Sequence, residues 1–402
     1  MATIRSFRAL RPRPDLADKV ASVPYDVVNT EEALDLAKGN PYSFLHIVRP
    51  EIDLPSSTDL YDDTVYDKAA ENFQSFIREG FLEEDPEPVL YIYRLVMNGR
   101  EQVGIAGCCA VKEYENNTIK KHEHTRKAKE DDRLRHMLTL RAHAGPVLLT
   151  FHSTSEIKEL MAKETSETAL YDFTDADGVR HTLWRCRFSK ELEAACSRVP
   201  ALYIADGHHR AAGAMRVKEA LFQREPEGEY NYFLTVTFPS DQMAIYPYNK
   251  YVSDLGGLST LDFLATVEKS FYLDRSGRTE PAEKGSFCMY LDGQWYELKE
   301  KVPSPAADPV AALDLSKFQN KLLEPILGIT DQRNDGRIDF AGGPGSPKKL
   351  ENWVDTQGGV AFTFYPVEVE ELMAVADAGL VMPPKSTWFA PKLRSGLLIH
   401  RF

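Results

Sequence analysis

The chain has 402 residues, of which 43% are hydrophobic, and it carries 48 Lys and Arg against 61 Asp and Glu for a formal net charge of −13. This length predicts a substantial core and two or three domains, and the composition excludes a disordered, collagen-like or disulfide-dense protein. The acidic balance disfavours nucleic acid and anionic membranes as partners, because binding to phosphate polymers depends mainly on clustered Lys and Arg.

The first residues and the cysteines predict a cytoplasmic protein. Residues 1–8 include positive charge but lead into no apolar stretch like that of a secretory signal, and apolar runs such as 146–151 are far too short to cross a membrane. The five cysteines are odd in number and form no Cys-x-x-Cys pair. That pattern favours reduced thiols over disulfides or a zinc framework.

The N-terminal region begins with alternating helical and extended patterns. Asn29 and Glu32 have the spacing of a capping box, and the helix that they open should end near Gly39. Residues 43–48 then have the pattern of a strand. Residues 62–79 form an amphipathic pattern, which predicts a longer helix.

Hairpin signals follow. Asn98-Gly99 separates extended runs at residues 89–96 and 102–111, and Asp177-Gly178 is a second turn signal of the same kind. Residues 126–143 are highly charged and compatible with a helix. Helices and hairpins mixed in this way predict an α/β protein, or α+β with a mixed sheet.

The C-terminal half continues the mixture, with a hairpin signal at Asp292-Gly293 and helical patterns near residues 313–327 and 367–376. A polar segment that contains Pro226 and Gly228 precedes this half. We therefore expect two domains, at residues 1–228 and 229–402.

One segment combines a buried strand, a tight turn and a helix. Asp206 and Gly207 end an apolar strand, and His208, His209 and Arg210 begin a helix-forming run. Glycine permits the turn, the first amides of a helix favour oxyanions, and an arginine side chain suits phosphate. We expect Arg210 to be an exposed phosphate clamp. The alternative is a well-capped helix with histidines on the surface.

A second polar cluster covers residues 120–125. Glu123 is a candidate base or metal ligand, and Lys121 and Arg133 could hold phosphate charge. The alternative is a solvated charge run. His122 and His124, together with the later histidine pair, also permit zinc, but neither Cys ligands nor His-Glu-x-x-His spacing supports it, and we assign no metal ligand.

Two further segments contain candidate residues. Asp26 stands among apolar residues ahead of the first helix, where a carboxylate serves either as a base or as a cap. Residues 382–396 are rich in cations, hydroxyls and aromatics and include Lys385. This run suits either a wall of a phosphate site or a structured tail held by its aromatic side chains.

Five ordered motifs together resemble the domain-of-unknown-function family 1015 over nearly the whole chain. They are Pro24-Tyr25-Asp26-Val27, Asn40-Pro41 with Ser43-Phe44-Leu45-His46, Lys121-His122-Glu123-x-Thr125, Asp206-Gly207-His208-His209-Arg210 and Met382-Pro383-Pro384-Lys385-Ser386-Thr387. One departure is Asn249-Lys250-Tyr251, which stands where a His-Arg pair is expected.

The Gly207-x-x-Arg210 box is distantly similar to the phosphate-binding box of the ParB and sulfiredoxin-like superfamily. Sulfiredoxin chemistry is disfavoured, because His208 stands where its nucleophilic cysteine would be. The acidic, mixed chain disfavours the DNA-binding branch. Free serine kinases are the most similar branch, so the resemblance implies a ParB/sulfiredoxin-like nucleotide-binding core with an additional C-terminal α/β region.

This resemblance implies a kinase that transfers phosphate from ATP or ADP, with Mg²⁺, to the hydroxyl of free serine or a similar metabolite. Its nucleotide-binding residues would be Lys121, Gly207, His208, His209 and Arg210. The catalytic candidates are Asp26, His122, Glu123 and Asp206. The substrate-binding candidates are Thr125, Arg133 and Lys385.

Two alternatives to the kinase hypothesis stay open. One is a regulatory module that binds a nucleotide without catalysis. The other is a metal-dependent hydrolase built on His122, His124, His208 and His209. The acceptor substrate and the oligomeric state are not predicted.

Overall fold

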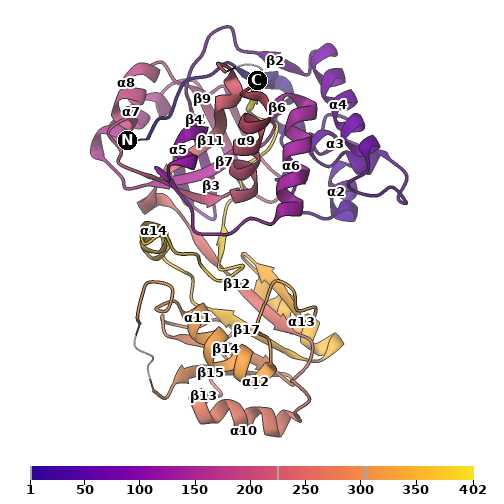
Figure 1. Cartoon of the computed structure of the whole chain (residues 1–402), viewed down its shortest axis with the longest axis vertical. Helices are drawn as coiled ribbons and strands as arrows, with labels where there is room; N and C mark the ends of the chain where they lie inside the picture. The colour runs from indigo at the N-terminus through magenta and orange to yellow at the C-terminus, as the bar shows by residue number, and fades with distance from the viewer. Residues whose placement is uncertain (1, 224–225, 303–305) are drawn as a thin grey trace. The chain divides into compact units, whose positions relative to one another are not determined.

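The computed structural model describes residues 2–223, 226–302 and 306–402, and it divides into two compact units (Figure 1). The first comprises Met1–Met243 and Pro391–Phe402, and the second comprises Ala244–Ala390. The boundary expected at residue 228 precedes strand β11 (Tyr232–Pro239), which lies inside the main sheet of the first unit. The division in the structure therefore comes after β11.

The first unit is built on a mixed sheet. Its strands besides β11 are β3 (Tyr91–Met97), β4 (Arg100–Ala110), β5 (Ile119–Lys120), β7 (Val147–Phe151), β8 (Tyr171–Thr174), β9 (Arg180–Arg185) and β10 (Leu202–Asp206). They lie in the order β5-β10-β7-β11-β4-β3-β9-β8. The pairs β5/β10 and β7/β11 are parallel, and the other pairs are antiparallel. The predicted mixed α/β class is confirmed.

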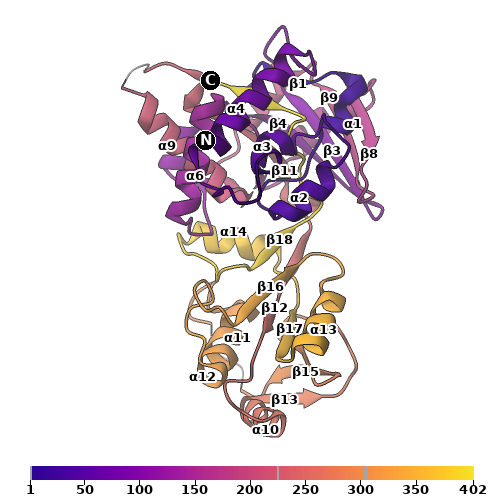
Figure 2. The same ribbon diagram turned by 90° about the vertical axis from the view of Figure 1, so that its right-hand side faces the viewer.

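Helices pack against this sheet through a shared apolar core. They are α5 (Val111–Glu115), α7 (Ser155–Thr165), α8 (Ser189–Cys196) and α9 (His208–Leu221). Helix α6 (Lys127–Leu140) lies beside α9 (Figures 1 and 2). Gly213 allows the two helices to approach, because a Cβ atom at this position would lie 3.1 Å from the Cβ of Arg133.

A second layer of the first unit combines a small sheet with helices. The strands are β1 (Ala9–Pro12), β2 (Leu82–Glu84), β6 (Ala142–His143) and β19 (Ile399–Arg401), in the order β2-β1-β19-β6. The helices are α1 (Ala17–Val20), α2 (Thr30–Ala37), α3 (Leu45–Val48) and α4 (Asp63–Arg78). Since β19 pairs with β1 and β6, the end of the chain belongs to the first unit.

Several locally encoded elements are confirmed. The amide of Glu32 donates to Asn29 Oδ1 over 2.9 Å and the amide of Asn29 donates to Glu32 Oε2 over 2.8 Å, which completes the capping box of α2. Asn98 and Gly99 have φ angles of 52° and 77° at the β3–β4 turn. These left-handed conformations are those that a two-residue hairpin of type I′ requires.

The strand predicted at residues 43–48 is wrong, because residues 45–48 form the short helix α3. The amide of Leu45 donates to Ser43 Oγ over 3.3 Å, which begins the helical turn. Leu45, Ile47 and Val48 are buried in the core of this layer. A short apolar run has the same pattern in a buried helix as in a buried strand, so periodicity did not separate the two.

The second unit contains another sheet. Its strands are β12 (Ile245–Val252), β13 (Phe271–Asp274), β14 (Ser286–Leu291), β15 (Gln294–Glu300), β16 (Ile338–Gly342), β17 (Val360–Phe364) and β18 (Thr387–Phe389). They follow the order β13-β15-β14-β17-β12-β16, and β18 also pairs with β12. The hairpin predicted at Asp292-Gly293 joins β14 to β15.

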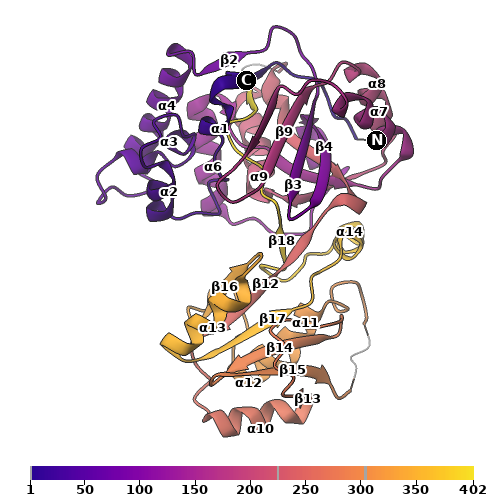
Figure 3. The ribbon, with the colours of Figure 1, turned by 180° about the vertical axis from the view of Figure 1, so that it is seen from behind.

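Helices of the second unit are α10 (Thr260–Ser270), α11 (Asp314–Phe318), α12 (Glu324–Leu327), α13 (Ser346–Gln357) and α14 (Val369–Asp377). Helix α13 covers one face of the sheet (Figure 3), and its Leu350 and Val354 belong to the same buried cluster as Tyr251 of β12. Among the described helices of both units, none combines the length and the apolar character needed to cross a membrane.

Candidate functional site

The turn between β10 and α9 forms the centre of the candidate site. Gly207 has a φ of 98°, and a Cβ atom there would lie 3.0 Å from Nε of Arg210. Glycine therefore permits both the left-handed turn and the close approach of the guanidinium. The first turn of α9 has no acidic residue and no side-chain cap. Its amides and the helix dipole make this end of α9 favourable for an anion.

Arg210 lies beside this turn and is buried, with 6% of its surface exposed. Its Nη1 donates to the carbonyl of Pro146, and its Nη2 lies 3.6 Å from Asp206 Oδ1. The buried Nε has no hydrogen-bond acceptor among the described residues. The prediction of an exposed clamp is wrong, because the side chain packs back against its own turn and the residues before β7.

Asp206 is paired with Lys392, which the sequence interpretation did not single out. The ammonium of Lys392 donates to Asp206 Oδ2 over 2.9 Å. Burial raises the pKa of Asp206, but the charges of Lys392 and Arg210 outweigh it and hold that pKa well below its usual range. The only sequence signal for Lys392 was its place in the cation-rich run at residues 382–396.

His122, Glu123 and His208 lie close together because β5 pairs in parallel with β10. The loop after β5 and the start of α9 therefore meet at one edge of the sheet. The imidazole rings of His122 and His208 are perpendicular, with their centroids 4.5 Å apart, and His208 Nδ1 lies 3.8 Å from Glu123 Oε2.

Both of these histidines are buried, with 2% and 5% of their surfaces exposed. Burial lowers the pKa of His122 to about 4, and burial with the neighbouring His122 lowers the pKa of His208 well below its usual value. Burial therefore favours the neutral form of both rings. His122 Nδ1 and His208 Nε2 have no hydrogen-bond partner within the described part of the chain.

His209 contacts Arg126, the residue that precedes α6. The amide of Arg126 donates to His209 Nε2 over 3.1 Å. Burial lowers the pKa of His209, whereas the charge of Asp26 raises it. Asp26 is exposed. The two candidate bases, Glu123 and Asp26, are thus associated with successive histidines of α9.

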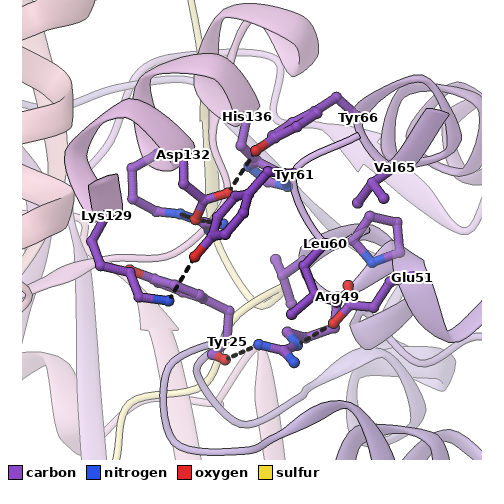
Figure 4. A pocket seen from close by; sticks show the side chains of 13 residues that line it. Tyr25, Arg49, Glu51, Leu60, Tyr61, Val65, Tyr66, Lys129, Asp132 and His136 are labelled. Carbon is purple, nitrogen blue, oxygen red and sulfur yellow. Dashed lines mark hydrogen bonds and ion pairs between the residues drawn. The ribbon is translucent and has the colours of Figure 1, made fainter. Parts of the chain in front are cut away.

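Two adjoining pockets lie in the first unit, one of them beside Arg210. Arg210 lines this pocket, and the two pockets share Tyr25, Val48, Arg133 and His136 in their walls. The guanidinium carbon of Arg133 lies 3.6 Å from the ring centroid of Tyr25, and Asp132 accepts two of its hydrogen bonds. Figure 4 shows the other pocket, whose lining includes Tyr25, Lys129 and Asp132. Arginine side chains therefore border both pockets.

Three predicted site residues have their polar groups engaged elsewhere. Lys121 donates to the carbonyl of Tyr114 over 3.1 Å, and Thr125 donates to Glu130. Lys385 belongs to the second unit, where its Nζ lies 4.9 Å from the ring centroid of Tyr248.

A mixed α/β sheet with a glycine turn leading into an uncapped helix defines the class of this fold and site. The family model described as "Protein of unknown function (DUF1015)" matches residues 4–316, and the chain belongs to this family. A comparison with curated proteins finds no match.

Similar solved structures include SbnI with a C-terminal truncation from Staphylococcus aureus, which is 13% identical with a TM-score of 0.40 over 73% of this chain and 87% of that one. A free serine kinase in complex with AMP is 14% identical with a TM-score of 0.34 over 73% of this chain and 92% of that one. A conserved hypothetical protein from Pyrococcus furiosus is 13% identical with a TM-score of 0.35, over 73% and 95%. Likeness at this level assigns no activity to the chain.

Proposed function

We propose that the first unit binds ATP or ADP at the Gly207–Arg210 turn and transfers a phosphate to the hydroxyl of free serine or a similar small metabolite. The observation that supports this most directly is Arg210, whose buried Nε has no acceptor and lies beside the uncapped start of α9. A buried donor without a partner is unfavourable by about 1–3 kcal/mol. A phosphate oxygen at this point would satisfy it.

The surroundings suit a phosphorylated ligand. The helix start supplies amides, Arg210 supplies a guanidinium, and Arg133 lines the same pocket. Arginine holds phosphate oxygens through two parallel hydrogen bonds, which a lysine cannot reproduce. The resemblance of the Gly207-x-x-Arg210 box to phosphate-binding boxes points to the same ligand.

Phosphoryl transfer also needs a carboxylate to accept the proton of the acceptor hydroxyl. Glu123 and Asp26 are our two candidates. Glu123 is positioned beside His208, and its side chain is 40% exposed. Asp206 is a less suitable base, because Lys392 and Arg210 stabilise its charged form. The roles predicted for Lys121, Thr125 and Lys385 stay predictions.

The cluster nearest to the helix start does not fit the Mg²⁺ that we expected from the resemblance. Mg²⁺ prefers oxygen ligands in octahedral geometry, whereas this cluster offers two imidazoles and one carboxylate. We therefore assign no step of the transfer to a magnesium ion held by these three residues.

Titration calorimetry with ATP, ADP and CTP, with mass-spectrometric detection of phosphoserine, tests the proposal. We expect an adenine nucleotide to bind and free serine to be phosphorylated. Arg210→Lys keeps a positive charge but removes Nε, and it should weaken nucleotide binding at least about tenfold, or 1.4 kcal/mol. Arg198→Ala is the matched control, because Arg198 forms an exposed pair with Glu156. If a nucleotide binds but no amino acid is phosphorylated, the kinase proposal is wrong and the alternative of a regulatory nucleotide-binding module is supported.

The same assay compares the candidate bases. Glu123→Gln and Asp26→Asn keep the size of each side chain and remove its charge. The variant at the true base should lose turnover by about 10²-fold or more and keep nucleotide affinity. Equal turnover in both variants would remove both residues as bases.

A further inference from the structure

We propose that His122, Glu123 and His208 form a binding site for a divalent transition-metal ion. One ligand atom from each residue lies within 4.8 Å of the other two. Two nitrogens and one oxygen suit Zn²⁺, Mn²⁺ or Fe²⁺, which accept imidazole, better than Mg²⁺ or Ca²⁺, which prefer oxygen.

A second observation points to a ligand at this place. His122 Nδ1 and His208 Nε2 are both buried and have no hydrogen-bond partner among residues 2–223, 226–302 and 306–402. Buried polar atoms are nearly always paired in folded proteins. An ion that accepted a lone pair from His122 Nδ1 and from His208 Nε2 would satisfy both unpaired nitrogens, and His208 Nδ1, which lies 3.8 Å from Glu123 Oε2, is the alternative ligand atom of that ring.

The geometry requires only a small closure. In a tetrahedral site with bonds of about 2.1 Å, ligand atoms lie about 3.4 Å apart. The present atoms are within 4.8 Å, and Glu123 has a flexible side chain that is 40% exposed. Its rotation toward the rings would complete three protein ligands and leave a position open for water or another ligand.

Other histidines near this site are separated from the cluster by their environment. His124 is exposed, and His209 Nε2 already accepts a hydrogen bond from the amide of Arg126. The proposed site therefore consists of His122, Glu123 and His208 and does not include the other histidines nearby. It also does not depend on whether the chain binds a nucleotide.

The test uses the full chain without an affinity tag, treated with a chelator and then titrated with ZnCl₂, MnCl₂ or MgCl₂ in the absence of nucleotide. We expect one Zn²⁺ or Mn²⁺ per chain and no comparable binding of Mg²⁺. His122→Ala and His208→Ala should weaken binding about 100-fold or more, and Glu123→Gln about tenfold. The cysteines do not compete at the surface, because all five are buried.

His124→Ala is the matched control, since it removes a neighbouring histidine outside the cluster and should leave affinity unchanged. Cobalt(II) provides a second measurement, because its visible absorption changes when imidazole ligands replace water. Circular dichroism verifies the fold of each variant, and His122→Gln or His208→Gln replaces the alanine variant at the same position if that variant fails to fold. Stoichiometry near zero, or His122→Ala binding Zn²⁺ as the original chain does, would overturn the proposal. Both results can be obtained whether or not the kinase proposal survives.

Discussion

Asp206 in the first unit and Lys250 in the second unit are both ionisable groups at a sheet, but their surroundings differ. Asp206 ends β10, and its carboxylate accepts a 2.9 Å hydrogen bond from Lys392. Lys250 lies within β12 and has 0% exposure. Its Nζ lies 4.8 Å from the ring centroid of Phe340, and no hydrogen-bond acceptor is present for it in the described residues.

The two units therefore differ in whether opposite charges compensate a buried ionisable group. In the first unit opposite charges compensate the carboxylate, and they lower its pKa despite burial. In the second unit burial and the charge of Lys385 lower the pKa of Lys250 to about 7, with the faces of aromatic rings as its neighbours. A charged Lys250 therefore destabilises the second unit, whereas a charged Asp206 stabilises the first.

The two groups act on stability in separate pH windows. The folded pKa of Asp206 is lowered, so its contribution is present above the unfolded value of about 4 and is lost as the pH falls further. The folded pKa of Lys250 is also lowered, so the unfolded chain binds more protons between pH 7 and 10.5. The contribution of Lys250 therefore becomes more favourable as the pH rises through that window.

The largest expected effect is a gain in stability from Lys250→Met. Methionine fills a similar volume and removes the buried charge. The lowering of the Lys250 pKa from 10.5 to about 7, at about 1.4 kcal/mol per pKa unit, corresponds to about 4 kcal/mol at pH 7, and we expect the free energy of unfolding of the second unit to rise by that order. Trp295, Trp353 and Trp388 lie in this unit and report its denaturant unfolding.

The pH dependence of that gain separates the charge from simple packing. The difference between Lys250→Met and the original chain should shrink by up to about 1.4 kcal/mol per pH unit above pH 7. Lys299→Met is the control, because Lys299 is exposed on β15 of the same unit. A gain in the free energy of unfolding that does not change with pH would mean that Lys250 binds its proton equally well in the folded and the unfolded chain. Burial would then not destabilise its ammonium.

A smaller effect, of opposite sign, is expected from Lys392→Met in the first unit. The substitution leaves Asp206 without its nearest cation and should lower the free energy of unfolding by about 2 kcal/mol. Hydrogen exchange of peptides from β10 and α9 localises the loss. Lys158→Met is the control, since Lys158 pairs with Asp241 on the surface, where ion pairs contribute little.

A double substitution tests whether the interaction between Lys392 and Asp206 accounts for this loss of stability. Asp206→Asn removes the charge that Lys392 compensates, so adding it to Lys392→Met should restore part of the lost stability. Additive losses in the double variant would show that the two side chains act independently.

The site shows which of its parts a sequence can reveal. The unit formed by β10, Gly207 and α9 was predictable, because an apolar strand, a glycine and a run of small residues are neighbours along the chain. The meeting of His122 with His208 was not, since it depends on the parallel pairing of the two-residue strand β5 with β10. A strand this short leaves no periodic signal.

Contacts between residues far apart in the sequence also explain why Lys392 was missed and why Arg210 was wrongly expected at the surface. Lys392 and Asp206 are 186 positions apart in the sequence, and they meet because the end of the chain returns to the first unit. Arg210 was expected at the surface, and its burial follows from its contact with the carbonyl of Pro146. A charge pattern alone does not show which element will cover an arginine.

The smallest expected effect is that of Lys385, whose positive charge also lowers the pKa of Lys250. Burial is the larger cause of its lowered pKa and the positive charge of Lys385 is the smaller one, so Lys385→Gln should raise the pKa of Lys250 and raise stability by less than about 1 kcal/mol at pH 7. NMR titration of chain labelled at the lysine side chains follows this pKa, and Lys250→Met assigns the signal. Lys349→Gln is the matched control, because Lys349 also lies over an aromatic ring, that of Trp353, in the same unit. If Lys385→Gln leaves the Lys250 titration unchanged while the effect of Lys250→Met persists, burial among the aromatic rings alone accounts for the lowered pKa, and the contrast with the ion-paired Asp206 becomes sharper.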